Sequence, residues 1–168
     1  MKILGIDPGT VVMGYGVVEY ERDEVTLVDY GAIKVPERLN IGEKLIYLYK
    51  ELLKVIQQHK PDAVAVEQPF VAKNVRTALA IGRAQAIALL AAAGEGIPTF
   101  EYTPAQIKQR VANYGASSKE QMQEMVRLQL EMKEVPQPND AADALAVAIC
   151  HVHEMHLKKL LDAQGEIQ

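Results

Sequence analysis

The first third of the chain carries short apolar and β-rich runs separated by turn residues. An apolar run over 3–6 ends at the turn signal Asp7-Pro8-Gly9, which predicts a strand that closes at an acidic residue. Two further β-rich stretches cover 14–20 and 25–35, with a charged tip between them. Because both connections are short, we expect an antiparallel meander of three strands.

Beyond residue 36 the apolar positions recur at helical spacing. Asn40 with Glu43 resembles a capping box before the first helical run. The pattern then predicts a helix over 41–59, strands over 63–66 and 97–102, and helices over 77–93, 104–113, 118–132 and from 140 onward. This order predicts an α/β protein with a five-stranded mixed sheet, three strands antiparallel and then two parallel, flanked by helices.

Composition adds the class and the compartment. At 168 residues, 49% hydrophobic and 24% charged, the chain predicts a single globular domain over 1–157, followed by a C-terminal tail over 158–168. A single cysteine, Cys150, excludes an internal disulfide framework and any Cys-rich zinc site. The longest apolar run, 86–93, is shorter than a membrane span, and the N-terminal segment does not resemble a secretory signal. We therefore expect a cytoplasmic protein without a membrane partner.

Charge distribution changes what net charge suggests. The formal net charge is -4, which by itself argues against a nucleic-acid partner. The window 68–119, however, contains six Lys and Arg residues and two Glu residues, a net charge of +4 that leaves -8 for the rest of the chain. Nucleic-acid binding is therefore compatible with the sequence.

Four carboxylates stand at the ends of predicted elements: Asp7, Glu67, Asp140 and Asp143. If the strand before Glu67 lies parallel to the first strand, Asp7 and Glu67 emerge at one edge of the sheet. Asp140 and Asp143 are three residues apart and share one helical face. Converging carboxylates need cations between them, and hard oxygen ligands suit Mg²⁺ or Mn²⁺. Two such ions can support phosphodiester hydrolysis.

A structural interpretation competes with this one for each residue taken alone. An aspartate at a helix start is often a cap or a partner of the helix dipole, and an aspartate before Pro-Gly is often part of a turn. Lysines at 108 and 119 are most often solvated surface charges. A carboxylate that closes an apolar strand, such as Glu67, is harder to explain structurally, and the four together favour a metal site.

The combined motifs resemble the RuvC family of Holliday-junction resolvases over about residues 2–150. The matching segments are Gly5-Ile6-Asp7-Pro8-Gly9-Thr10, Gly14-Tyr15-Gly16, Glu67-Gln68, Phe70-Val71-Ala72-Lys73-Asn74, Phe100-Glu101-Tyr102, Gln106-Ile107-Lys108-Gln109, Lys119-Glu120-Gln121 and Asp140-Ala141-Ala142-Asp143-Ala144-Leu145-Ala146. Around Lys119 the chain departs from the family at 115–118 and at Met122, so the local loop there is expected to differ in shape.

The resemblance implies an RNase H-like fold and a homodimer that makes paired cuts in opposed strands of four-way junction DNA, in homologous recombination and DNA repair. It implies that the four carboxylates bind two Mg²⁺ ions per subunit, with Mn²⁺ as a substitute. It also implies catalytic roles for Lys108 and Lys119, a base contact for Phe70, and a branch-migration complex of the RuvA and RuvB type as partner. The expected DNA-binding residues are Phe70, Lys73, Asn74, Arg76, Lys108 and Lys119.

Two other functions fit parts of the sequence. An Asp-x-Gly-Thr turn after a first strand also occurs in actin-like sugar kinases, but those need two such domains, and 168 residues are too few. A junction-binding or RNA-processing relative on the same fold would lack resolvase activity.

Three further features carry structural expectations. We expect histidines 151, 153 and 156 at the surface or an interface, and Cys150 in the core. The Ala-rich helix over 77–93 is expected either at a dimer contact or covered by the core.

Overall fold

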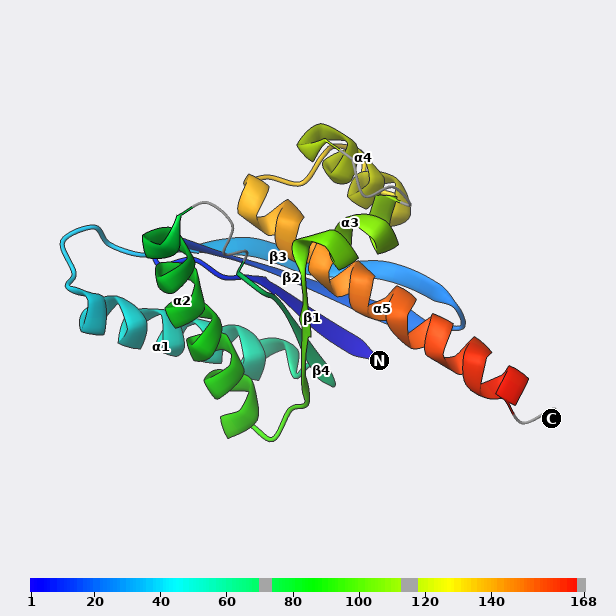
Figure 1. Ribbon diagram of the computed structural model, residues 1–168, viewed down its shortest axis with the longest axis horizontal. Coiled ribbons are helices and arrows are strands. Elements are labelled where there is room, and N and C mark those ends of the chain that lie inside the picture. The colour runs from blue at the N-terminus through cyan, green and yellow to red at the C-terminus, as the bar shows by residue number, and fades with distance from the viewer. Residues whose placement is uncertain (70–73, 113–117, 166–168) are drawn as a thin grey trace.

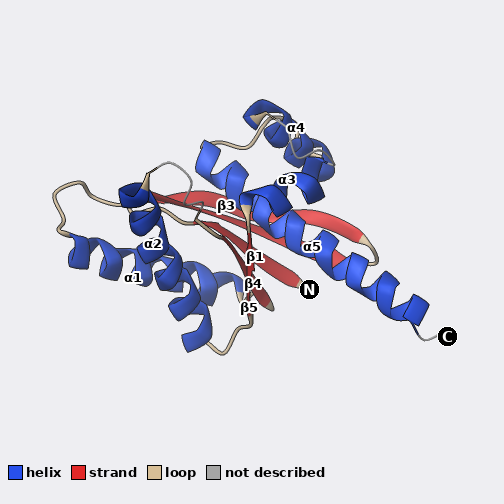
Figure 2. Ribbon diagram, viewed as in Figure 1, coloured by secondary structure: helices blue, strands red, loops and turns tan. Residues whose placement is uncertain are grey.

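The first three strands form the meander that the sequence predicts. The computed structural model is described here for residues 1–69, 74–112 and 118–165. Strand β1 (Lys2–Asp7) pairs antiparallel with β2 (Val12–Glu21), and β2 pairs antiparallel with β3 (Glu24–Lys34). The β2–β3 pairing contains a bulge between Val17 and Val18. These strands make one half of the sheet (Figures 1 and 2).

Two parallel strands complete the sheet on the other side of β1. Strand β4 (Ala63–Glu67) pairs parallel with β1, and β5 (Thr99–Tyr102) pairs parallel with β4. The strand order is therefore β3-β2-β1-β4-β5, with β1 in the centre. The predicted mixed sheet of three antiparallel and two parallel strands is confirmed.

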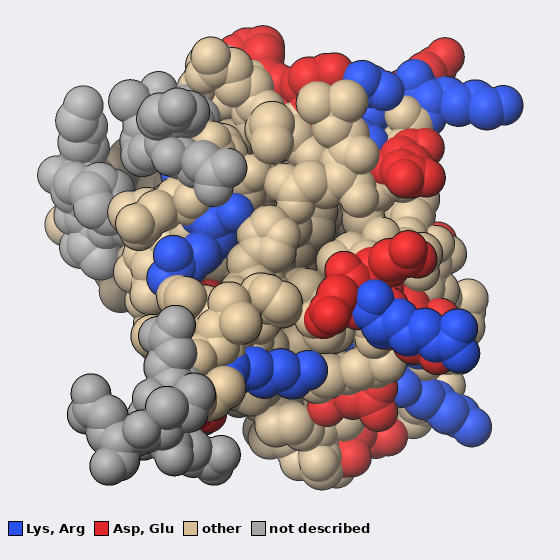
Figure 3. Space-filling view, turned by 90° about the vertical axis from the view of Figure 1, so that its right-hand side faces the viewer, with Lys and Arg blue, Asp and Glu red and all other residues tan. Residues whose placement is uncertain are grey.

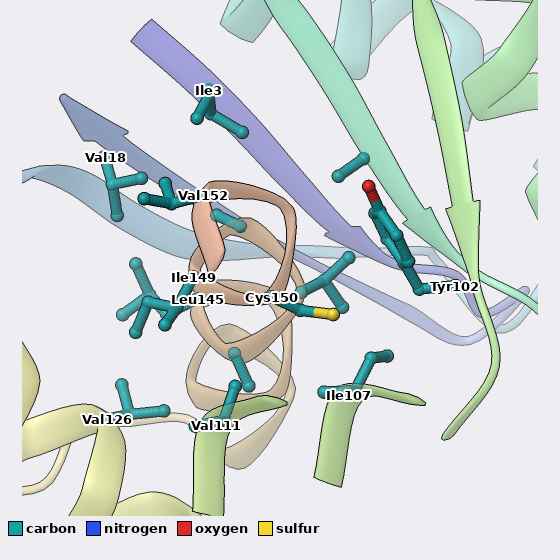
Figure 4. Packing of buried hydrophobic residues seen from close by; sticks show 14 of the residues in the cluster. Ile3, Val18, Tyr102, Ile107, Val111, Val126, Leu145, Ile149, Cys150 and Val152 are labelled. Carbon is teal, nitrogen blue, oxygen red and sulfur yellow. The ribbon is translucent and has the colours of Figure 1, made fainter. Parts of the chain in front are cut away.

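Helices cover both faces of this sheet. Helices α1 (Ile41–His59) and α2 (Val75–Gly94) lie on one face, while α5 (Asn139–Gly165) crosses the other face and carries α3 (Pro104–Ala112) and α4 (Lys119–Gln129) on its outer side (Figures 1 and 2). Each face has its own apolar core. Figure 4 shows the core on the α5 side, where Leu145, Ile149 and Val152 lie among side chains of the sheet, α3 and α4. The fold is thus a three-layer α/β arrangement.

The predicted start of α1 is confirmed in detail. The Glu43 amide donates to Asn40 Oδ1 at 3.0 Å, and the Asn40 amide donates to Glu43 Oε2 at 2.8 Å, which forms a capping box. Lys60 adopts the left-handed conformation at the other end, with φ 49°, and Pro61 follows. These local signals explain why this helix could be bounded from sequence.

Helix α5 lies unusually close to the sheet because glycines face it. A Cβ added to Gly5 would lie 2.1 Å from the Ala144 carbonyl oxygen, and one added to Gly14 would lie 1.9 Å from the Asp140 carbonyl oxygen. A Cβ on Gly16 would lie 2.6 Å from the Leu145 side chain. The backbones of β1 and β2 therefore touch the helix directly.

Several predicted boundaries differ from the structure. Helix α5 continues to Gly165, into the segment after residue 157 that the sequence predicts to be a C-terminal tail. Helix α4 ends at Gln129, whereas the sequence predicts an end near 132. Leu130 is its C-cap residue, and Glu131 then takes a φ of 51°. Strand β5 begins at Thr99, two residues later than predicted.

One prediction about the histidines is wrong. His151 is 1% exposed and lies within the core contacts of α5, not at the surface. His153 is half-buried and its Nδ1 lies 2.8 Å from the Arg110 carbonyl oxygen. Cys150 is fully buried, as predicted, and burial raises the pKa of its thiol to about 12.

Helix α2 is long and apolar enough to cross a membrane by length and composition alone. Its 18-residue window has a mean hydropathy of 1.4, and 28% of that window is buried. Core helices of other proteins pass the same test, so one such helix is weak evidence for a membrane span. In this fold α2 packs against α1 and β4, while its Val75, Leu79 and Leu90 side chains are exposed.

Candidate active site

The pairing of β1 with β4 brings the first two predicted carboxylates together. Ile6 lies opposite Val66 in the parallel register, so Asp7 and Glu67 follow one another at the same edge of the sheet. Both preceding strands are buried apolar runs, and both carboxylates are partly buried. The neighbourhood that the sequence predicted for these two residues is confirmed.

The other two carboxylates come from the first turn and a half of α5. Asp7 pairs with Gly14 across the β1–β2 ladder, and the backbone of Gly14 lies against the backbone of Asp140. A side chain at position 14 would push the helix away from this edge. The glycine therefore allows α5 to bring Asp140 and Asp143 to the carboxylates of the sheet.

The pKa values of these groups record how closely they interact. Burial, the charges of Glu67, Asp143 and Asp140, and a hydrogen bond to Glu67 together raise the pKa of Asp7 to about 9. Burial also raises the pKa of Glu67 and of Asp143. Without a cation, the protein thus holds a proton at Asp7 at neutral pH, because several negative charges cannot share this space.

Two lysines offset part of that negative charge. Lys119 Nζ lies 3.3 Å from Asp143 Oδ2, and this contact lowers the pKa of Asp143 against the larger effect of burial. Lys108 and Lys119 also lower the pKa of Glu67 through their charges. A cavity of about 250 Å³ opens between these groups, lined by Glu67, Pro104, Ile107, Lys108, Lys119, Met122, Asp143 and Ala146.

The sequence did not single out the apolar wall of this cavity. Ile107 and Met122 contribute it from α3 and α4, each close to one of the lysines along its helix. Ile107 directly precedes Lys108, and Met122 follows Lys119 by one helical turn. These spacings along the sequence were the signal that could have identified the apolar wall, because they place a buried apolar side chain close to each lysine.

The donor set fits a hard divalent cation. Carboxylate oxygens are the ligands that Mg²⁺ and Mn²⁺ prefer, and clustered buried carboxylates are relieved of repulsion when cations bind. Over the described ranges 1–69, 74–112 and 118–165, no three acidic, histidine or cysteine side chains already surround one point at coordination distance.

The remaining predicted DNA contacts lie near the start of α2. Asn74 caps that helix, with its Oδ1 accepting from the Thr77 amide at 3.2 Å, and Arg76 is exposed in the first turn. Phe70 and Lys73 lie outside the residues that the structure describes. The end of β4 and the start of α2 flank this segment, so it begins directly after the candidate site.

Comparison with known proteins gives one consistent result. The family profile described as "Crossover junction endodeoxyribonuclease RuvC" matches residues 3–151. A protein of that description from Dehalococcoides mccartyi is 56% identical over 167 residues, which cover 99% of each chain. Another from Chloroflexus aurantiacus is 51% identical over 153 residues, 91% of this chain and 93% of the relative.

Solved structures agree in the fold. Thermus thermophilus RuvC in complex with a Holliday junction substrate has a TM-score of 0.88 at 34% identity, covering 94% of this chain and 96% of that chain. A yeast mitochondrial Holliday junction resolvase, at 14% identity and a TM-score of 0.69, shares the fold. The predicted RNase H-like architecture is therefore confirmed, and the chain belongs to the RuvC family of crossover junction endodeoxyribonucleases.

Proposed function

We propose that this nuclease resolves four-way DNA junctions by hydrolysing opposed strands with divalent ions held by Asp7, Glu67, Asp140 and Asp143. The observation that carries the proposal is the meeting of acidic groups from β1, β4 and α5 at one sheet edge, where burial and the neighbouring charges raise the pKa of Asp7 to about 9. Such crowding of buried negative charge suits cation binding. A junction-binding relative without nuclease activity has no need of such a cluster of buried carboxylates.

The identity and number of the ions belong to the same proposal. Nucleases of this family depend on divalent metal ions. We favour Mg²⁺, two per subunit, with Mn²⁺ as a substitute, because four carboxylates can share two hard cations. When bound, such ions activate a water for attack on phosphorus and offset charge on the leaving oxygen.

The protein's own groups then have separate tasks. Asp7 and Glu67 stand at the ends of buried strands, so their backbones are rigid and the ions would be held at a fixed place relative to the sheet. Lys119, which contacts Asp143, is our candidate for neutralising charge at the scissile phosphate. Lys108 lies across the same cavity and is more suited to hold the DNA backbone.

A DNA-contacting segment adjoins this centre. Asn74 and Arg76 lie exposed at the start of α2, on the chain that follows Glu67. Phe70 and Lys73 precede them, and an aromatic residue there would stack on an unpaired base, typically worth about 1–3 kcal/mol. The basic window over 68–119 supports this assignment.

A homodimer is the second part of the proposal. Helix α2 carries an apolar stripe on its outer side, in which Val75, Leu79 and Leu90 are 65%, 60% and 59% exposed. Gly82 lies between them, and a Cβ added there would meet nothing within 4 Å, so a partner helix could approach closely. A second copy that buries this stripe would give each junction two active sites.

Membership of the family suggests a partner and a compartment. The family suggests cooperation with a branch-migration complex of the RuvA and RuvB type, in the cytoplasm and without membrane attachment.

Figure 3 shows the end of the molecule where α5 terminates, and basic and acidic side chains are interleaved on that face. Such mixed charge offers DNA no continuous basic track, so we expect the junction to engage the opposite end, near the carboxylates.

The test is a gel assay of an end-labelled four-way junction with Mg²⁺. Wild-type protein is expected to give paired nicks, while Asp7→Asn binds the junction but does not cut, because it lacks one carboxylate ligand. Linear duplex of the same sequence is the control substrate. The absence of paired nicks with wild type, or full cutting by Asp7→Asn, would contradict the proposal.

A further inference from the structure

A buried polar contact joins β5 to α5 outside the candidate active site. His151 Nδ1 lies 2.7 Å from the Tyr102 hydroxyl oxygen, and the Phe100 ring lies with its centroid 4.3 Å from that of the imidazole. In the part of the chain that the structure describes, His151 Nε2 has no hydrogen-bond partner. Burying a polar side chain with one nitrogen unpaired costs stability, so the pair calls for a role.

The chemistry of the pair makes the contact directional. Burial lowers the pKa of His151 to about 4, so the ring is neutral at physiological pH. In one tautomer of the neutral ring the Tyr102 hydroxyl donates to Nδ1 and the ring proton is on Nε2; in the other, Nδ1–H donates to the hydroxyl oxygen. The result is a single hydrogen bond in apolar surroundings, where misalignment is penalised more than in water.

Both residues lie on the elements that carry the carboxylates. Tyr102 lies opposite Glu67 in the β4–β5 register, and its carbonyl accepts from the Gln68 amide at 2.8 Å. His151 follows Asp143 by eight residues on α5, about 12 Å along the helix axis. The hydrogen bond therefore links the strand pair that holds Glu67 to the helix that carries Asp143.

Much of the remaining contact between α5 and the sheet is apolar. The helix meets β1 and β2 through Gly5, Gly14 and Gly16 and through alanines such as Ala144 and Ala148. Larger side chains of the helix, such as Leu145 and Ile149, pack in the same core. Apolar packing is non-directional, whereas a hydrogen bond holds the two groups that it joins within a narrow range of distance and angle.

We propose that the Tyr102–His151 hydrogen bond is a positioning contact, which sets how far Asp143 lies from Glu67 and thereby tunes the affinity of the carboxylates for divalent ions. This inference rests on the proposed function of those carboxylates. Neither Tyr102 nor His151 is a catalytic residue in this scheme, because their link to the ions runs only through the backbone positions of Glu67 and Asp143.

The experiment compares Tyr102→Phe with wild type, since this change removes one hydroxyl and keeps the ring. Calorimetric titration of the DNA-free protein with Mn²⁺ is expected to give an about fivefold higher dissociation constant. Single-turnover cleavage should need an about fivefold higher Mg²⁺ concentration for half-maximal rate, while the junction dissociation constant in Ca²⁺ stays within twofold of wild type.

The matched control is Tyr20→Phe. The Tyr20 hydroxyl donates to Asp23 Oδ1 at 2.7 Å and lies 3.4 Å from His156 Nδ1, so the variant removes a phenolic contact to the far end of α5. It is expected to leave both metal titrations unchanged. A second pair, His151→Leu and His151→Asn, extends the test, because the asparagine amide can still accept near the Nδ1 position. His151→Asn is expected to bind Mn²⁺ more tightly than His151→Leu.

Two results would overturn the positioning role: unchanged Mn²⁺ binding in folded Tyr102→Phe, or an equal loss in Tyr20→Phe. Failure of the proposed function is distinguishable, because then wild type would not nick the junction at all. If Tyr102→Phe does not fold, the comparison of His151→Asn with His151→Leu decides, and equal Mn²⁺ affinities for these two would overturn the inference.

Discussion

Asp7 is the residue on which the candidate site depends most strongly. Its pKa of about 9 lies far above the ordinary value of 3.8, because burial and the charges of Glu67, Asp143 and Asp140 all disfavour ionisation. Lys108 and Lys119 act in the opposite sense through Glu67 and Asp143. Between about pH 4 and pH 9, Asp7 is therefore protonated in the folded protein without metal, whereas it is ionised in the unfolded chain.

This difference has a defined sign. Since the folded state holds the extra proton, raising the pH across that window lowers the free energy of unfolding, and divalent ions oppose the loss by replacing the proton. In chelator, wild type is expected to lose thermal stability from pH 6 to pH 8.5. Asp7→Asn, which cannot ionise, should melt above wild type at pH 8; each gain of 1 kcal/mol corresponds to roughly 2–4 °C.

Differential scanning calorimetry of both proteins with and without Mg²⁺ measures this effect. Asp162→Asn, the same chemical change at an exposed position of α5, is the control and should follow wild type. A melting temperature of Asp7→Asn at or below that of wild type in chelator at pH 8 would contradict the argument.

Single residues also mark where sequence reasoning was sufficient and where it was not. Asp7 and Glu67 were identifiable because each closes an apolar strand, where a carboxylate has no packing role. His151 was misassigned because a histidine late in a C-terminal helix resembles a solvated residue. Its spacing of three and seven residues from Ala148 and Ala144, which are buried, was the signal that it shares their face.

At the scale of elements, strand ends and helix starts were predicted best because local chemistry defines them. The capping box at Asn40 and the turn after Asp7 are such signals. Helix α5 was underestimated because residues 158–164 are mostly polar, yet they contain no helix breaker before Gly165. The close approach of α5 to β1 and β2 could not be predicted, since glycine in a strand indicates a close neighbour without identifying it.

Gly14 limits how closely α5 can approach the sheet. A Cβ at this position would lie 1.9 Å from the Asp140 carbonyl oxygen, so Gly14→Ala must shift α5 or the strand. Overpacking of this kind typically costs about 1–3 kcal/mol in the free energy of unfolding, and the shift also separates Asp140 from Asp7. Cleavage is therefore expected to fall more than tenfold at temperatures where the variant remains folded.

Urea unfolding together with single-turnover cleavage of the junction tests this prediction. Gly94→Ala is the control, because a Cβ there meets nothing within 4 Å, and it should retain both stability and activity. Normal cleavage by folded Gly14→Ala would show that α5 does not depend on this contact for its position.

For the whole molecule, the outer stripe of α2 bears on the oligomeric state. Sequence composition could not separate a covered core helix from a subunit interface, because both are apolar on more than one face. The fold narrows the choice, since α2 is packed on one side by α1 and β4 and carries exposed Val75, Leu79 and Leu90 on the other. That geometry suits a contact between two copies.

Leu79→Glu is expected to break this contact, because a dimer would bury the new charge without a partner. Light scattering at micromolar protein should give about twice the 18.5 kDa chain mass for wild type and a mass near that of one chain for the variant. Leu128→Glu, at an exposed leucine of α4, is the control and should remain dimeric. A wild-type mass of one chain would contradict the dimer.

The glycine-lined contact of α5 has a consequence for how this protein can change. At most positions a core can absorb an added methyl group by small movements of several neighbours, but at Gly5 and Gly14 backbone meets backbone and no flexible side chain can give way. Mutational tolerance at Gly5 and Gly14 should therefore be far lower than their small size suggests. Because the same contact holds the acidic residues of α5 in place, variation that threatens folding and variation that threatens chemistry coincide at these two positions.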